Sequence, residues 1–167
     1  MTVPIRDVIQ VSASDTHCIA TWRNVLVAVW REVPDPSRVA EVQRALSQLA
    51  TRQGSVCVVI LLEQGAGIPS AETRSAAAGL MRSSGDHVVG WAVVIEGGGI
   101  LRPTIRSVAV AAKLIARTKF PLQICATADE AAQWLAGLPA AEGCAQGQLD
   151  QLPSVVSQVR ASLTQAA

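Results

Sequence analysis

Residues 55–74 decide the fold of this chain, and they read SVCVVILLEQGAGIPSAETR. The run 56–62 is uninterruptedly apolar and rich in valine, which is typical of a strand covered on both faces. Ser70 then stands at the entry to an alanine-rich helical pattern over about 70–83. A buried strand that leads directly into a helix indicates an α/β fold.

The same alternation of strands and helices continues on both sides of this stretch. Two strand patterns, 17–21 and 24–30, stand so close together that they predict an antiparallel hairpin. A helix over about 37–53 ends at Gly54, and a second apolar run over 88–96 predicts the next buried strand. A helix from near Pro103, a short strand over 121–126 and a helix capped by Thr127 complete the pattern. We therefore expect the order β-β-α-β-α-β-α-β-α, with a mixed sheet of about five strands and helices packed on it.

The sequence predicts four parts. Residues 1–14 are expected to form a polar N-terminal arm with some β character, and 15–138 the α/β domain. Residues 139–148 are expected to form a linker, and 149–167 a C-terminal amphipathic helix. In the last part Leu149, Leu152, Val156, Val159 and Leu163 recur at intervals of three and four. This apolar stripe is too narrow to fold alone, so the helix must dock. It would dock on its own domain, on a second copy to give a homodimer, or on a partner.

The composition excludes several classes of function. The chain has 167 residues, a net charge of +1 and only 16% charged residues, so no general positive field recruits nucleic acid or an anionic membrane. No apolar run approaches the roughly 18 residues that span a bilayer, and the N-terminus lacks a secretory signal. The four cysteines form no CxxC pair, which favours buried free thiols in a reducing cytoplasm. No metal-ligand spacing is present, and no cofactor is predicted.

The element order and several local phrases resemble the STAS superfamily, in particular its SpoIIAA-like branch. The phrases are the hairpin 18–30, the strand 56–62, Pro69-Ser70-Ala71-Glu72-Thr73-Arg74, the segment 91–99, and the ending Phe120-Pro121-Leu122 with Ala131-Ala132-Gln133-Trp134-Leu135. The similarity covers roughly residues 15–138. It implies a non-enzymatic domain of bacterial signalling that binds other proteins and is sometimes controlled by phosphorylation. Members of the anti-anti-sigma type carry a phosphorylated serine at the position that Ser70 occupies here. The Asp-Ser/Thr-x-Gly phrase of those members is absent from this chain.

Ser70 has two interpretations. As a helix N-cap, its hydroxyl would accept a hydrogen bond from a first-turn backbone N–H, and Glu72 would suit the positive end of the helix dipole. As a phosphoacceptor, it would place a phosphate at that same helix end, although Glu72 would repel it.

Two further groups are candidates for binding. Gly97, Gly98 and Gly99 follow a strand and precede a helix, where backbone N–H groups can hold an anion. Arg102, Arg106, Lys113 and Arg117 fall on one side of the expected third helix, where they would face solvent or an acidic partner. Four charges without interleaved aromatic residues argue against nucleic acid.

The sequence leaves three functions open. The first is a regulatory or scaffolding protein-interaction module of the STAS-like type. The second is a domain that binds a small anionic ligand, such as a nucleotide or a lipid headgroup, at its glycine loops. The third and least supported is an enzyme that uses Asp86 and His87, because no nucleophile is linked to that pair by a motif. We therefore expect no catalytic residues.

Overall fold

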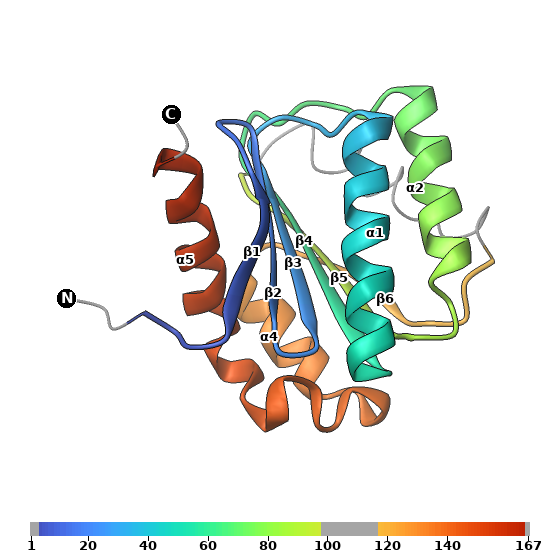
Figure 1. Ribbon diagram of the computed structural model, residues 1–167, viewed down its shortest axis with the longest axis vertical. Helices are drawn as coiled ribbons and strands as arrows, with labels where there is room; N and C mark the ends of the chain where they lie inside the picture. Colours follow the sequence, from blue (N-terminus) through green and yellow to red (C-terminus); the bar gives the residue numbers. More distant parts are fainter. Residues whose placement is uncertain (1–3, 98–116, 166–167) are drawn as a thin grey trace.

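The computed structural model describes residues 4–97 and 117–165, and these form a central sheet with helices on both faces (Figure 1). The strands are β1 (Val8–Ala13), β2 (His17–Trp22), β3 (Val25–Trp30), β4 (Val56–Leu62), β5 (Val88–Ile95) and β6 (Leu122–Cys125). The helices are α1 (Pro36–Gln53), α2 (Ala71–Ser83), α4 (Ala128–Ala136) and α5 (Leu152–Gln165). The helix expected from Pro103 lies outside the described residues.

The sheet is mixed, as the sequence predicts. Its six strands lie in the order β1-β2-β3-β4-β5-β6, where β2 is antiparallel to both of its neighbours and β3 to β6 are parallel. The α/β class and the hairpin are therefore confirmed. The strand count exceeds the expected five because β1 comes from the segment assigned to the N-terminal arm. Only one face of β1 is covered, and the polar residues Gln10 and Ser12 interrupt its apolar ones, which weakens the strand signal in the sequence.

The helices divide into two layers. On one face α1 and α2 cover a core that includes Ile19, Leu26 and Val58. On the other face α4 and α5 cover a core that includes Trp22, Val27 and Val59. Successive residues of a strand point to opposite faces, so β2, β3 and β4 supply both cores and are almost completely buried. This two-sided burial explains the continuous apolar runs in the sequence.

Local chemistry sets the helix ends that the sequence indicates. The Asp35 carboxylate accepts a hydrogen bond from the backbone N–H of Arg38 at 3.0 Å and caps α1. The Thr127 hydroxyl accepts one from the N–H of Glu130 at 3.1 Å and caps α4. The Glu130 carboxylate in turn accepts from the N–H of Ala126 at 2.7 Å, one residue before the cap. The expected capping box is thus present in a slightly shifted form.

The C-terminal helix docks on its own domain. The stripe residues Leu152, Val156, Val159 and Leu163 are buried in the core between α5 and the sheet, so a second copy cannot use them in this arrangement. Gln158 of α5 also bonds the backbone of Ile5 in both directions, at 2.8 and 3.4 Å.

The segment expected as a linker packs into the same core. Residues 139–148 contain two short 3-10 helices, Pro139–Ala141 and Cys144–Gly147. Ala141, Cys144 and Ala145 from this segment are buried. Small apolar side chains allow its backbone to approach the sheet closely, which a composition-based prediction of a linker does not anticipate.

Candidate functional site

Ser70 lies where the sequence predicts, at the entry to α2 and exposed at the surface. Its hydroxyl oxygen accepts a hydrogen bond from the Thr73 N–H at 3.1 Å and donates to the Thr73 hydroxyl, also at 3.1 Å. Thr73 in turn donates to the Pro34 carbonyl at 3.0 Å, which ties α2 to the start of α1. The N-cap interpretation is therefore confirmed, and phosphorylation stays a prediction.

The two other predicted groups fall mostly outside the described residues, namely Gly98, Gly99, Arg102, Arg106 and Lys113. Gly97 is described and has a φ of 87°. A Cβ there would stand 2.9 Å from the Gln64 side chain, so close packing as well as conformation requires glycine. Arg117 is exposed.

A chain of charges crosses the carboxyl edge of the parallel strands. Glu63 follows β4 and Glu96 follows β5, and Arg160 of α5 reaches both carboxylates. Its Nη2 donates to Glu96 at 2.5 Å, and its Nε lies 3.1 Å from Glu63 as an ion pair without hydrogen-bond alignment. Arg31 also donates to Glu63 at 3.1 Å. The two carboxylates at this edge are thus neutralised by two arginines within the chain itself.

A buried histidine lies at the same edge, and the sequence gives no signal of its surroundings. His17 is 1% exposed and stacks on Trp30, with ring centroids 5.1 Å apart. The Ser14 hydroxyl lies 2.8 Å from Nδ1, and Glu41 of α1 lies 3.5 Å from Nε2. Trp30 is buried as well.

The electrostatics of this cluster keep His17 neutral and Glu41 charged. Burial, followed by the nearby Arg38 guanidinium, lowers the pKa of His17 despite the opposing Glu41 carboxylate. Burial alone would raise the pKa of Glu41. Hydrogen bonds from Arg38 and Ser12 outweigh that effect and lower it.

The serine, histidine and carboxylate of this cluster do not form an open catalytic site. The Ser14 oxygen is already occupied, because it accepts from the Thr16 and His17 backbone N–H groups at 3.1 and 3.3 Å. These bonds close the β1–β2 turn. Asp86 and His87 are exposed at the opposite end of the sheet, before β5. Within residues 4–97 and 117–165 no cluster of metal-ligand side chains occurs, and no helix is both long and apolar enough to cross a membrane.

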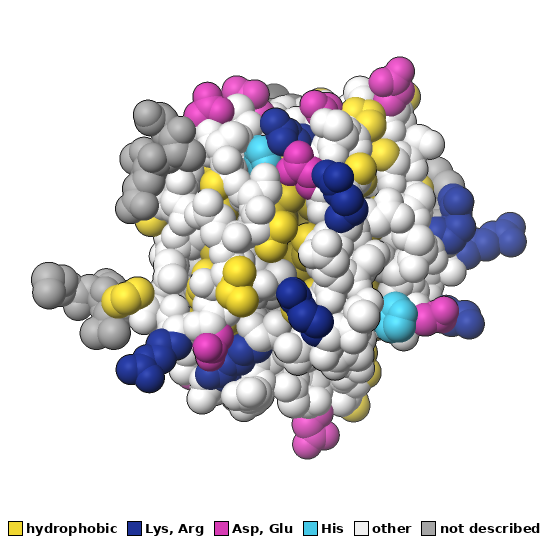
Figure 2. Space-filling model, in the orientation of Figure 1, with side chains coloured by type: hydrophobic (Ala, Val, Ile, Leu, Met, Phe, Trp, Pro, Cys, Tyr) yellow, Lys and Arg dark blue, Asp and Glu magenta, His cyan; other side chains and the backbone are white. Residues whose placement is uncertain are grey.

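An open groove runs between β1 and α1, and we call it the β1–α1 groove. Its lower part is a hollow of about 640 Å³ lined by Ile9, Thr21, Leu49 and Arg52 together with polar residues of neighbouring turns. Ile9 pairs with Thr21, so its side chain is on the α1 face of the sheet, where it is 61% exposed. Figure 2 shows apolar side chains along this groove with basic side chains beside them.

The wall that α1 contributes to the groove is basic. Glu41, Arg44, Gln48 and Arg52 recur at intervals of three and four and so share one side of the helix. Glu41 contacts β1 and β2 through Ser12 and His17, which orients this side toward β1. Arg44 and Arg52 are exposed and form no ion pair within the described part of the chain.

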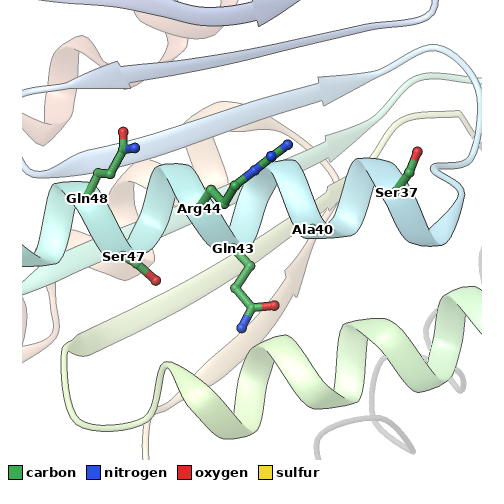
Figure 3. Close-up of a pocket in the computed structure, with 6 residues that line it drawn as sticks. All are labelled: Ser37, Ala40, Gln43, Arg44, Ser47 and Gln48. Carbon is green, nitrogen blue, oxygen red and sulfur yellow. The ribbon is translucent and has the colours of Figure 1, made fainter.

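A second hollow, of about 660 Å³, lies along the outer surface of α1 and is shown in Figure 3. It is lined by Ser37, Ala40, Gln43, Arg44, Ser47 and Gln48. All six belong to one helix, so the hollow has a single wall. Gln43 points toward α2, where it donates to Ser83 at 3.2 Å, while Arg44 and Gln48 point away from α2 (Figure 3). This surface therefore extends the basic wall of the groove and is not a separate enclosed site.

Comparisons with protein-family models, curated proteins and solved structures find no match to this chain.

Proposed function

We propose that this chain is a regulatory or scaffolding protein-interaction module, as the resemblance to STAS domains implies, and that the β1–α1 groove is its contact surface. The observation that carries the proposal is the exposure of Ile9 in the groove. Ile9 is 61% exposed beside a hollow with a polar rim. Apolar surface rimmed by polar residues is typical of interaction sites. Val11, also on β1, is 47% exposed.

The charge of the groove selects the partner. Arg44 and Arg52 form no ion pair among the described residues, whereas Asp7 and Glu41 already pair with Arg23 and Arg38. The free charge along the groove is therefore positive. An apolar segment that carries Asp or Glu along one side would bury Ile9 and neutralise both arginines. The proposed partner is a protein with such an acidic, amphipathic segment.

The test compares partners captured from a lysate of the native organism by matched variants. Ile9→Asp places a charge in the groove, and Ile68→Asp places the same charge on another exposed isoleucine, 48% exposed and outside the groove. We expect a specific partner to be lost with Ile9→Asp and retained with Ile68→Asp. An acidic segment of that partner, made as a peptide, should bind the wild-type chain with an affinity that falls as salt rises. Equal loss with both variants, or a peptide that does not bind, would contradict the proposal.

Phosphorylation at Ser70 would regulate the same module from a different surface. A phosphate there would gain from the dipole of α2 but would remove the hydrogen bond that the Ser70 hydroxyl donates to Thr73. Ser70→Asp should change the amount of the partner captured above, while Ser75→Asp, inside the exposed part of α2, serves as the control. An unchanged capture by Ser70→Asp would count against phosphoregulation and leave the groove proposal intact.

A further inference from the structure

Two of the four cysteines interact with each other in the core. Cys57 lies near the start of β4, and Cys144 lies in the short 3-10 helix Cys144–Gly147. They are 0% and 2% exposed and belong to the same core. The Cys57 backbone N–H donates to the backbone carbonyl of Asn24 at 3.1 Å, and the side chain of Asn24 contacts the Cys144 sulfur, so one residue joins the two cysteines. Their thiols are near enough for each to shift the pKa of the other.

Asn24 holds Cys144 in this position. Its side-chain Nδ2 donates to the Cys144 sulfur at 3.5 Å, and its side-chain Oδ1 accepts from the Ala145 N–H at 2.7 Å. Arg23 donates to the Ala145 carbonyl at 2.7 Å. Ala145 and Gln146 both have positive φ, which is costly for non-glycine residues, so these bonds stabilise an otherwise unfavourable turn.

The two thiols have different acidities. The hydrogen bond from Cys57, helped by the one from Asn24, lowers the pKa of Cys144 although burial opposes it. The same hydrogen bond, together with burial, raises the pKa of Cys57. The thiolate is the reactive form of cysteine, so Cys144 is the better nucleophile of the two.

A surface hollow lies next to the residues that surround Cys144. The 640 Å³ hollow at the lower end of the β1–α1 groove is also lined by Asn24, Gly143 and Gln146. Asn24 contacts the sulfur directly, and Gly143 precedes Cys144 in the chain. Residues that line the hollow thus contact or adjoin Cys144, and Gly143 and Gln146 among them are exposed.

We propose that Cys57 and Cys144 form a redox pair that closes a disulfide when the protein meets hydrogen peroxide. The Cys144 thiolate attacks one peroxide oxygen, the O–O bond breaks, and with one proton the products are a sulfenic acid and water. The Cys57 sulfur then attacks the Cys144 sulfur, its thiol proton leaves with the hydroxyl as a second water, and the S–S bond forms. Each cysteine is oxidised by one electron and the peroxide is reduced by two.

The bond would join the start of β4 to the segment that precedes α5. A cross-link between residues so distant in sequence restricts the unfolded chain strongly. Oxidation should therefore raise the melting temperature of the protein, and reduction with dithiothreitol should reverse the rise.

The experiment treats the reduced full-length protein with hydrogen peroxide, blocks remaining thiols with N-ethylmaleimide under denaturing conditions and maps the peptides by mass spectrometry. Digestion with trypsin and a glutamate-specific protease separates Cys125 from Cys144, because Glu130 and Glu142 lie between them. We expect a Cys57–Cys144 cross-linked peptide, with Cys18 and Cys125 still blocked. The same treatment of Cys144→Ala should remove the cross-link, whereas Cys18→Ala should keep it.

Peptide mapping of the wild-type protein tests whether the Cys57–Cys144 disulfide forms, even if a variant fails to fold. Oxidation of Cys144 to a sulfinic acid without a cross-link, a disulfide that uses Cys18 or Cys125, or four thiols that stay reduced would each overturn the proposal.

Discussion

The two faces of β1 differ although the same strand supplies both. On one face Val8 and Ala13 pack against the core that α5 covers, and α5 contacts β1, β2 and β3. On the other face Ile9 stays exposed, and α1 reaches β1 chiefly through the bond from Ser12 to Glu41. One helix thus completes the fold on its side, and the other leaves a groove.

The difference teaches which apolar residues serve stability and which are available for binding. Burial of a large apolar side chain stabilises a protein by about 1.5–3 kcal/mol, and Ile9 obtains little of this within its own chain. A partner in the groove would supply it. The comparison predicts that substitutions on the covered face lower the free energy of unfolding, whereas substitutions on the open face weaken binding and leave stability nearly unchanged.

The largest effect is expected at the covered face. Leu152 of α5 is 0% exposed, so Leu152→Ala removes buried methyl groups and leaves a cavity. Its free energy of unfolding should fall by about 2–5 kcal/mol, as for other buried leucines. Chemical denaturation monitored by circular dichroism measures this. A loss of less than about 1 kcal/mol would show that α5 is only loosely docked.

A smaller effect is expected where Arg160 ties α5 to the carboxyl edge. Arg160→Ala leaves Glu96 without its ion pair, while Glu63 keeps Arg31. Because the Arg160 side chain is 37% exposed, the free energy of unfolding should fall by only about 1 kcal/mol, and less at high salt. Denaturation at two salt concentrations checks both statements. Arg160→Lys is the control, since lysine keeps the positive charge but lacks the planar guanidinium that contacts Glu63 and Glu96 together.

Hydrophobic patterns predicted most of the fold. Val56–Leu62 and Val88–Ile95 are read correctly because burial on both faces leaves continuous apolar runs. The α5 stripe is recognised by its spacing, and Ser70 and Thr127 by capping chemistry. The strand β1 is missed as a separate element because a strand with one open face carries polar residues, and 139–148 is read as a linker because small residues are common in both settings.

The site depends on distances between segments that periodicity does not encode. Ile9 and Arg52 lie 43 positions apart, and only the pairing of β1 with β2 places them on one groove. Cys57 and Cys144 likewise come together through the packing of residues 139–148. The spacing of cysteines in the sequence gives no sign of that contact.

The next effect concerns pH at the contact between α1 and β1. His17 has a pKa below its usual value of 6.5, so between that value and its folded pKa the unfolded chain binds more protons. The free energy of unfolding should therefore fall as pH drops below about 6.5, and His17→Gln should flatten this part of the curve. Glu41 contributes only at more acidic pH, because its pKa is lowered from 4.5 and its stabilising effect is lost as pH falls through the folded pKa.

His87→Gln is the control for this pH series. His87 is exposed at the other end of the sheet, and the chain has only these two histidines. Removing it should leave the slope below pH 6.5 in place. If the two glutamine variants flatten the curve equally, burial of His17 is not the cause of the slope.

The smallest effect is expected at the open face of β1. Ile9→Thr keeps a β-branched residue suited to a strand but removes apolar surface that the chain itself hardly buries. Its free energy of unfolding should stay within about 0.5 kcal/mol of wild type in the same denaturation experiment. Binding of the acidic peptide should weaken at the same time. A destabilisation as large as that of Leu152→Ala would mean that Ile9 packs within its own domain in solution, and the contrast between the two faces of β1 would no longer hold.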